Sequence, residues 1–409
     1  MTLLHVLVAG IGGVTADFAP NWPEPVLARA LAARGHRVSA LGYLDPGNPA
    51  MASARSVVDG IDVRRARPAI WPSARVAEAL RDLPPPDIIH LFHLRNVFVA
   101  NLVRWARQRH IPVIHSPVGP FHDAYLVDDR ERPYASAPHY DRLAYDLPGL
   151  LRQFAREPKP RRQLTNYLLH APLRGVDRFV ASSYHEQEIL QRMGVPPETI
   201  DVIPLWITPP PTLVPDDSVK NGIDGPLILF IGQLTVRKGA DLLIEALPVI
   251  LARHPAAVCV IVSHNPERQA QLVARAAELD VAGNLRFAGR VTEAQKLALM
   301  RAAACWVIPS RYEGFGLPLL EAMQAGVPLV TTNIPVIDEI VTDNEDGLLV
   351  APENPQALAY AVARVLSDAH LRTRLAAAGR RTLADRFAED HLLTRVLETY
   401  ARARGAGRP

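Results

Sequence analysis

The segment 302–326 restricts the fold more than any other part of the chain. Residues 302–308 are an apolar run with the length and composition of a buried strand. Gly314 and Gly316 follow and allow backbone conformations that other residues avoid, and Pro318 suits the first turn of a helix. A strand that leads through a glycine turn into a helix is the repeating unit of parallel α/β sheets. The segment therefore predicts an α/β fold.

The same order of elements occurs twice more. Residues 3–9 form an apolar run that is followed by a glycine turn at 10–13 and a helical segment at 23–34. The apolar run 227–231 is followed by a glycine-bearing turn at 232–239. Further strands alternate with helices through both halves, which is typical of doubly wound sheets. Since 409 residues are also too many for one hydrophobic core, we predict two Rossmann-like domains.

A proline-rich segment, 205–226, separates the two predicted domains. It has little apolar periodicity, and Asp216, Asp217 and Gly225 add to its linker-like composition. We therefore place the first domain at 1–204 and the second at 227–385.

Composition and charge narrow the functional classes. The formal net charge of +3 is small for this length and gives no support to nucleic-acid binding. Cys259 and Cys305 lie within apolar strand-like runs, which predicts buried reduced thiols instead of disulfides or a metal site. The N-terminus lacks the basic start of a signal peptide, and no apolar stretch is long and uninterrupted enough for a transmembrane helix. We expect a cytoplasmic location.

The turn after 302–308 has the features of an anion site that is flanked by carboxylates. Backbone amides at a helix start point back over the strand end and stabilise an anion such as a phosphate. Glu313 and Glu321 frame this turn and suit hydrogen bonds to sugar hydroxyls on either side of the phosphate. The turn 232–239 offers a second helix start and adds Lys238 beside it.

Glu313 and Glu321, eight positions apart around Gly-Phe-Gly-Leu-Pro, resemble the E-x7-E signature of retaining glycosyltransferases of family 4. That family has the GT-B fold, so the resemblance implies two Rossmann-like domains that face an interdomain cleft. The first domain would bind the acceptor and the second a nucleotide-diphosphate sugar. A helix within 386–409 would cross back to the first domain. The similarity covers 1–14 and 80–400 and is strongest from 227 to 351.

The resemblance also implies roles for individual residues. Glu313 would contact the donor sugar as a catalytic residue, and Glu321 would bind the ribose. Lys238 would meet the diphosphate and take part in catalysis. The donor-binding positions are Gly12, Gly13, Gln233, Arg237, Lys238, Glu313, Gly314, Phe315, Gly316, Leu317 and Glu321.

Two positions depart from the family pattern. Gln233 stands where relatives carry an arginine, and a lost guanidinium–phosphate contact costs about 2 to 3 kcal/mol unless Arg237 replaces it. Val118 stands where relatives carry a histidine near the donor sugar. His115, a candidate catalytic residue, or His122 would take its place. The alternative for either histidine is a structural hydrogen bond.

Together these features predict a retaining glycosyltransferase that uses a UDP- or GDP-linked sugar and a glycan or lipid-linked glycan as acceptor. The sequence has no D-x-D triplet and no histidine–cysteine cluster, so we expect no metal, and cations and helix starts would stabilise the leaving diphosphate. Two alternatives stay open. One is a glycoside phosphorylase on the same fold. The other is a catalytically silent nucleotide-sugar-binding protein, which Gln233 and Val118 favour.

The segment 123–164 fits no simple strand or helix period. Arg152, Arg156 and Lys159 belong to a run of basic residues that continues to 178. A solvated loop-and-helix excursion is the simplest interpretation. The alternatives are an acceptor lid and, through 152–178, a peripheral contact with anionic lipid on the inner face of the membrane.

Overall fold

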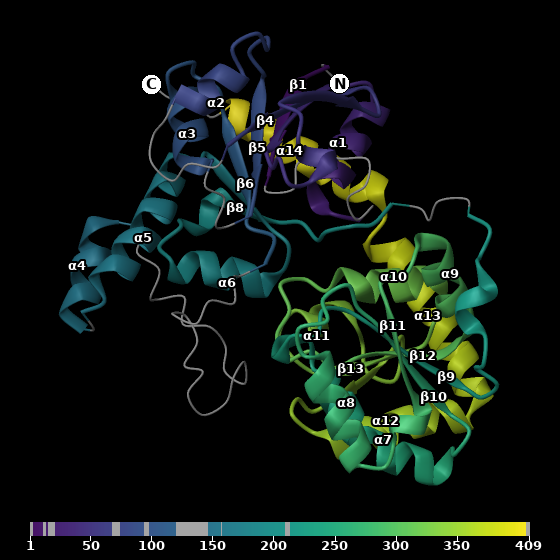
Figure 1. The fold of residues 1–409 in the computed structure, drawn as a ribbon. Helices are drawn as coiled ribbons and strands as arrows, with labels where there is room; N and C mark the ends of the chain where they lie inside the picture. Colours follow the sequence, from purple (N-terminus) through teal and green to yellow (C-terminus); the bar gives the residue numbers. More distant parts are fainter. Residues whose placement is uncertain are drawn as a thin grey trace. The chain divides into compact units, whose positions relative to one another are not determined.

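The chain forms two compact units in the computed structural model (Figure 1). The structure describes residues 3–10, 14, 21–67, 74–93, 98–119, 146–156, 158–208 and 213–405. The first unit contains the described residues up to Thr208 and those from Glu389 onward. The second unit contains the described residues between them.

The first unit is built on an eight-stranded sheet in the order β3-β4-β2-β1-β5-β6-β7-β8. Only β3 and β4 pair antiparallel among these strands. The strands are β1 (His5–Ala9), β2 (Arg37–Tyr43), β3 (Arg55–Val58), β4 (Ile61–Ala66), β5 (Ile88–Phe92), β6 (Val113–Ser116), β7 (Arg178–Ala181) and β8 (Ile200–Val202). The order reverses between β1 and β5. Such a switch point, outside the carboxyl ends of the strands, is where open α/β sheets bind ligands.

Helices and short 3-10 turns complete the first unit. They are α1 (Pro23–Ala33), η1 (Pro49–Met51), α2 (Ala74–Ala79), α3 (Val99–Arg107), α4 (Leu147–Arg156), α5 (Pro160–His170), η3 (Ala171–Gly175), α6 (Tyr184–Arg192), η4 (Pro197–Thr199) and α14 (Glu389–Gly405). The core includes Leu7 of β1, Ile89 and Leu91 of β5, and Leu102 of α3, all fully buried. Each such side chain stabilises the fold by about 1.5 to 3 kcal/mol.

The last helix, α14, packs within the first unit. It contacts α1, β6 and β7. The hydroxyl of Tyr400 lies 2.8 Å from Nδ1 of the buried His90 in β5, and the Arg395 guanidinium donates to the carbonyl oxygen of Val202. These contacts attach the helix to the unit that contains the N-terminal strand.

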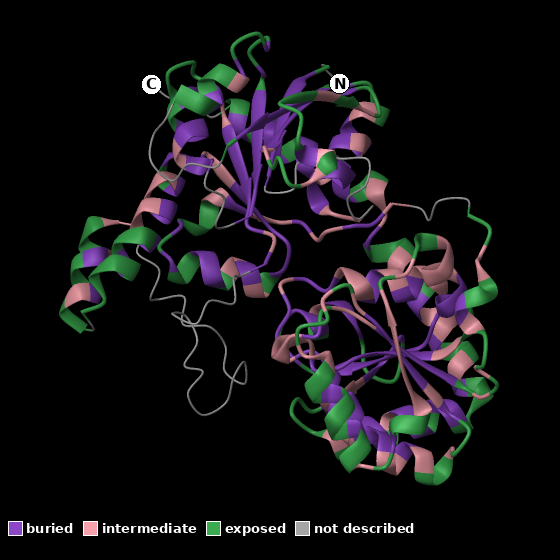
Figure 2. Cartoon of the chain, viewed as in Figure 1, coloured by how far each residue is buried: buried purple, intermediate pink, exposed green. Residues whose placement is uncertain are grey.

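The second unit is built on a six-stranded sheet in the order β11-β10-β9-β12-β13-β14, and all neighbouring pairs are parallel. The strands are β9 (Leu227–Ile231), β10 (Val258–Val262), β11 (Leu285–Gly289), β12 (Ala303–Ile308), β13 (Leu329–Thr332) and β14 (Leu348–Val350). The switch point of this sheet lies between β9 and β12. Figure 2 shows buried residues concentrated in the central strands of both units.

Helices connect the parallel strands of the second unit. They are η5 (Asp217–Lys220), η6 (Val236–Lys238), α7 (Ala240–Arg253), α8 (Gln269–Glu278), η7 (Ala282–Asn284), α9 (Glu293–Ala302), α10 (Leu317–Ala325), α11 (Ile337–Ile340), α12 (Pro355–Ser367) and α13 (Ala369–Arg386). Cys259 and Cys305 are fully buried and unpaired, and burial raises the pKa of both thiols, that of Cys305 to about 12. The prediction that both thiols are buried is confirmed.

Two segments are more ordered than their composition indicates. Within the predicted linker, η5 forms and the backbone amide of Asp216 donates to the carbonyl oxygen of Ala294 on α9 at 3.1 Å. Within the segment without clear periodicity, α4 and α5 form a helix pair, whereas 123–145 lies outside the described residues. In each segment one element packs against a distant part of the chain, η5 against α9 and α5 against α3. Among the described helices, none is long and apolar enough to span a bilayer.

Candidate functional site

The candidate site lies at the carboxyl ends of β9 and β12 in the second unit. The turn 232–239 follows β9, and the turn 309–316 follows β12. These two strands are neighbours at the switch point of the sheet, so the topology brings together segments that are far apart in the sequence. Lys238 ends the first turn, and Glu313 lies in the second.

Glu313 is the buried centre of a partly exposed ionic cluster. Its Oε1 accepts hydrogen bonds from Nζ of Lys238 and from the hydroxyl of Ser310, both at 2.6 Å. Its Oε2 accepts a hydrogen bond from the Arg237 guanidinium at 3.2 Å. The guanidinium also donates to the carbonyl oxygen of Tyr312 at 3.1 Å. Two cations on one carboxylate give this cluster a net positive charge.

The cluster keeps Glu313 ionised. Burial alone would raise the pKa of its carboxyl, but the charges of Lys238 and Arg237 and the hydrogen bonds from Lys238 and Ser310 lower that pKa to about 2. Burial lowers the pKa of the Lys238 ammonium, and the charge of Glu313 opposes this change. At neutral pH Glu313 can therefore accept hydrogen bonds and orient its two cations, but it has no proton to donate.

Arg311 links the two turns through hydrogen bonds. Its guanidinium donates to both carboxylate oxygens of Asp241, at 3.0 and 2.8 Å, and to the carbonyl oxygen of Val236 at 2.7 Å. It also forms an ion pair with Glu353. Because the arginine side chain is 8% exposed, these bonds are shielded from water and hold η6 against the end of β12.

Gly239 allows the close approach of the two turns. It has a left-handed backbone with φ of 71°, and a Cβ at this position would lie 2.0 Å from the carbonyl oxygen of Pro309. No side chain fits there, so the start of α7 can lie directly against the strand end. Gly316 precedes α10 with φ of 98° and gives the second helix start. Neither helix start has a side-chain cap.

The second glutamate of the motif lies in a separate ion pair. Oε2 of Glu321, on α10, is 2.9 Å from Nζ of Lys296 on α9, and both side chains are largely buried. Phe315 is buried and lies edge-to-face with Phe387 at a centroid distance of 6.3 Å, which anchors the turn. The backbone of this turn includes the half-buried Gly314 and Leu317.

Gln233, where the family resemblance implies an arginine, is exposed at the edge of its turn. Arg237 supplies a guanidinium nearby in sequence, although that guanidinium is held by Glu313 and Tyr312. Among the described residues, no three His, Cys, Asp or Glu side chains gather as metal ligands.

The structure adds three residues to which the sequence analysis gave no role: Ser310, Arg311 and Lys296. A charged residue in the turn that follows a buried strand was an available signal for Arg311. Lys296 gives no comparable signal, because its pairing with Glu321 depends on how α9 packs against α10.

The switch point of the first unit carries different polar groups. Oε1 of Glu24, a fully buried residue of α1, is 2.8 Å from Nε2 of His93, which directly follows β5. A Cβ at Gly10, directly after β1, would lie 1.9 Å from the same Glu24 oxygen, so glycine is required there. The predicted donor-binding residues Gly12 and Gly13 lie outside the described residues.

His115 is fully buried in β6. Its Nε2 lies 3.2 Å from the carbonyl oxygen of His93. Burial, opposed in part by this hydrogen bond, lowers the pKa of the imidazole to about 3, so the ring is neutral. These contacts favour the structural role for His115 over the catalytic one. Val118 has a left-handed φ of 57°, which is strained for a β-branched residue, and His122 lies outside the described residues.

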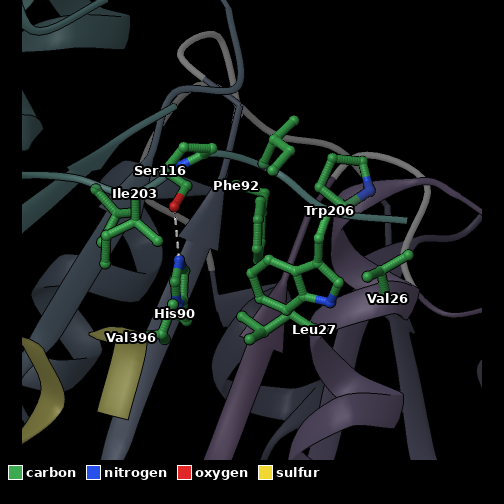
Figure 3. Close-up of a pocket in the computed structure, with 12 residues that line it drawn as sticks. Val26, Leu27, His90, Phe92, Ser116, Ile203, Trp206 and Val396 are labelled. Carbon is green, nitrogen blue, oxygen red and sulfur yellow. Dashed lines mark hydrogen bonds between the residues drawn. The ribbon is translucent and has the colours of Figure 1, made fainter. Parts of the chain in front are cut away.

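A small apolar pocket of the first unit lies beside His90 (Figure 3). Its enclosed volume is about 20 Å³, enough for about one water molecule and too little for a sugar. The ring nitrogens of His90 lie 2.8 Å from the hydroxyls of Ser116 and Tyr400. Nε1 of Trp206 donates to Glu389 at 3.1 Å. The polar groups of the lining are thus engaged within the protein. The lining residues are Pro23, Val26, Leu27, His90, Phe92, Ser116, Val180, Ile203, Pro204, Leu205, Trp206 and Val396.

Two family models match the chain in succession. The model described as "Glycosyl transferase 4-like domain" matches residues 26–206, and "Glycosyl transferases group 1" matches residues 215–382. The second match contains every residue of the ionic cluster.

Individual relatives cover only part of the chain. A glycogen synthase of Mycobacterium tuberculosis is 35% identical over 206 residues, which are 47% of this chain and 50% of that protein. A D-inositol 3-phosphate glycosyltransferase of Xylanimonas cellulosilytica is 32% identical over 242 residues, 56% of this chain and 57% of that protein. The chain thus spans about half the length of the curated relatives it matches.

Solved structures resemble nearly the whole chain. The Anabaena protein HepE in complex with UDP has a TM-score of 0.70 and 16% identity, with 97% of this chain and 99% of that chain covered. At this identity the similarity concerns the fold.

Proposed function

We propose that this chain moves a sugar from a nucleotide-diphosphate donor to a glycan or lipid-linked glycan. The chain belongs to the GT-B glycosyltransferases of the family 4-like type, since two glycosyltransferase models match it in succession and its predicted fold is confirmed. The observation that carries this proposal is the cluster of Lys238, Arg237 and Glu313 at the switch point of the second sheet. It offers fixed cations where this sheet topology binds ligands.

Lys238 and Arg237 would stabilise the leaving diphosphate. Breaking the bond between sugar and diphosphate leaves negative charge on the diphosphate, and preorganised cations stabilise that charge more in the transition state than in the ground state. The uncapped starts of α7 and α10 add backbone amides that point toward an anion. Glu313 fixes the position of both cations, since each is bonded to its carboxylate.

The two glutamates would bind hydroxyl groups of the donor. Glu313 is ionised and can accept a hydrogen bond from the donor sugar, and Glu321 can accept hydrogen bonds from the ribose. Phe315, Gly314, Gly316 and Leu317 would supply the turn between them. We take UDP and GDP as the nucleotide candidates, and the UDP complex of the structurally similar HepE is a reason to test UDP first.

Retention of the anomeric configuration and independence from metal are part of the proposal. The E-x7-E spacing supports retention, and the two fixed cations support catalysis without a divalent ion. The first unit would bind the acceptor, with Gly12 and Gly13 contributing to donor binding, and we expect the enzyme to act on the cytoplasmic side.

A donor panel tests the proposal. We expect one or a few UDP- or GDP-linked sugars to raise the unfolding temperature and to be hydrolysed slowly without acceptor. With acceptor, NMR of the first product formed should show the anomeric configuration of the donor. An inverted product would remove retention from the proposal, and a donor that binds without turnover would favour the silent binding protein. Sugar phosphate release from a glycoside only when phosphate is present would identify the phosphorylase instead.

A further inference from the structure

The helices α4 and α5 of the first unit expose several leucines and bury several polar side chains, although each helix also buries one leucine, Leu150 or Leu169. Leu147 and Leu151 of α4 and Leu164 of α5 are 53%, 59% and 46% exposed. Polar residues occupy buried positions of the same two helices: Gln153, Gln163, Asn166 and His170. Surface helices of water-soluble domains normally bury their apolar stripe. Figure 2 shows how much of α4 is exposed.

Gln163 links α5 to α4 and also caps the start of its own helix. Nε2 of Gln163 donates to the carbonyl oxygen of Gln153 at 3.2 Å, and Oε1 of Gln163 accepts from the backbone amide of Lys159 at 3.2 Å. Leu147 and Leu151 are four residues apart and therefore lie on one face of α4. Since they do not fill the contact with α5, this face is available for an external surface.

Helix α5 and the elements that pack against it are strongly basic. α3, α4 and α5 each contain two arginines, η3 contains one, and these four elements contain no acidic residue. The arginines are Arg104, Arg107, Arg152, Arg156, Arg161, Arg162 and Arg174. By contrast, α6 of the same unit contains Glu186 and Glu188. The positive charge is therefore concentrated on one part of the unit, because α5 packs against α4, α3 and η3.

Three of these arginines line an open groove between α3 and η3. Arg104, Arg107 and Arg174 border a groove of about 490 Å³. A guanidinium nitrogen of Arg107 lies 3.5 Å from the carbonyl oxygen of Arg174, and within the described part of the chain no carboxylate forms an ion pair with the three. Such a groove suits the phosphate of a lipid headgroup.

We propose that α4, α5 and the arginine groove form a docking surface for an anionic lipid bilayer. The exposed leucines enter the interface between headgroups and acyl chains, and the arginines contact headgroup phosphates. A second copy of the chain fits this surface less well, because a symmetric contact would bring two identical basic surfaces together. Nucleic acid would use the arginines but leave the leucines exposed. The proposal does not rest on sugar transfer.

Co-sedimentation of the full chain with vesicles tests the proposal. We expect binding to vesicles of equal parts phosphatidylglycerol and phosphatidylcholine, and at least about tenfold weaker binding to phosphatidylcholine alone. Raising the salt concentration should weaken the binding, since surface charges are screened. Equal binding to both vesicle types, or to neither, overturns the proposal.

Matched variants separate the leucine face from general surface effects. Leu147→Glu combined with Leu151→Glu should lower vesicle affinity at least about tenfold. Val57→Glu, at a 70% exposed position of β3 in the same unit, should leave it unchanged. Arg104→Glu combined with Arg174→Glu should lower vesicle affinity by about fivefold or more per arginine, whereas Arg192→Glu on α6 should have little effect on it.

Three results contradict the proposal. The first is an equal loss of vesicle binding in the leucine variant and in Val57→Glu. The second is a wild-type dimer that ignores vesicles and that the leucine substitutions dissociate in sedimentation velocity. The third is binding to single-stranded DNA without binding to the anionic vesicles. Unchanged unfolding temperatures establish that the variants are folded.

Discussion

In both sheets of this chain the strand order reverses at a switch point, but the polar groups at the two switch points differ. In the second unit, the ends of β9 and β12 hold an ionised cluster in which Lys238 and Arg237 share Glu313. In the first unit, the ends of β1 and β5 hold the buried Glu24–His93 pair, and His115 nearby is neutral. The sheet topology therefore determines where a ligand can bind, but the residues that follow the strands determine which ligand.

Under the proposed function, this difference favours the second unit as the site of the diphosphate. A diphosphate needs several donors and positive charge, which the second switch point supplies through two fixed cations and two helix starts. At the first switch point, Glu24 and His93 are engaged with each other, and among the described residues there the buried atoms left without a hydrogen-bond partner are Oε2 of Glu24 and Nδ1 of the neutral His115, which add no positive charge for a diphosphate. Each experiment below tests whether the two switch points differ in this way.

The largest expected effect is that of Lys238→Ala. Because charge on the leaving group develops in the transition state, this variant should lower kcat and raise KM, and reduce kcat/KM by about a hundredfold or more. Lys238→Arg should lose less activity because it keeps the positive charge. It should still fall short of the wild type, because a planar guanidinium approaches a phosphate differently from an ammonium. Lys220→Ala is the matched control, since Lys220 forms a surface pair with Asp217. Near-normal kcat/KM in folded Lys238→Ala would move the diphosphate elsewhere.

Glu321→Ala should have the next largest effect. Hydrogen bonds to a charged group are worth about 1.5 to 3 kcal/mol, so the nucleotide diphosphate should bind roughly ten- to a hundredfold more weakly. Glu278→Ala, which removes an exposed carboxylate of α8 that pairs with Arg275, is the control. Calorimetric titration measures both. Unchanged affinity in the folded Glu321 variant would remove this residue from the site.

Acid should destabilise the first unit before the second. Burial lowers the pKa of both His90 and His115 to about 3, from the 6.5 of an exposed histidine, so the unfolded chain takes up these protons first and stability is lost as the pH falls from 6.5 toward 3. The pKa of Glu313 is lowered to about 2 from 4.5, so its contribution is lost only below about pH 4.5.

Between pH 7 and pH 5 the first unit should therefore lose about 1 to 2 kcal/mol for each of the two histidines, and Glu313 should change the second unit very little. Hydrogen exchange resolved by peptide, corrected for the intrinsic pH dependence of exchange, distinguishes the units. If β9 and β12 lost protection at the same pH as the strands of the first unit, or at a higher pH, the predicted order of acid destabilisation would be wrong.

The smallest effect is expected from removing divalent metal. If the fixed cations of the second unit carry the charge of the diphosphate, activity should stay the same in excess chelator. The comparison is the initial rate with chelator and after addition of magnesium or manganese. Loss of activity with chelator and recovery with either metal would show that Lys238 and Arg237 are insufficient.

The sequence predicted the α/β class and most of the second unit well. Strands such as 227–231 are apolar runs that end at glycine turns, and glycine positions such as Gly239 and Gly316 are needed for the backbone that the structure has. These are local properties of the chain. The proline-rich segment was harder to predict, because η5 depends on the contact of Asp216 with α9.

The composition of the site was predictable, but its electrostatics were not. The spacing of Glu313 and Glu321 selects both residues, yet it does not show that Glu313 pairs with two cations and Glu321 with a third. Lys238 is separated from Glu313 by 75 positions, and their 2.6 Å ion pair arises from the neighbouring positions of β9 and β12. The exposure of the leucines of α4 was likewise not predictable, since burial cannot be deduced from a segment that lacks clear periodicity.

Calorimetric titration of UDP and GDP into the wild type, Lys238→Ala and His93→Asn tests the central claim most directly. Asparagine tolerates the left-handed backbone of His93, so this variant alters the first switch point with little backbone strain. The account predicts that one of the nucleotides binds the wild type, that Lys238→Ala weakens this binding by about tenfold or more, and that His93→Asn leaves it unchanged. Binding that survives in Lys238→Ala but is lost in folded His93→Asn would place the diphosphate in the first unit and contradict the account.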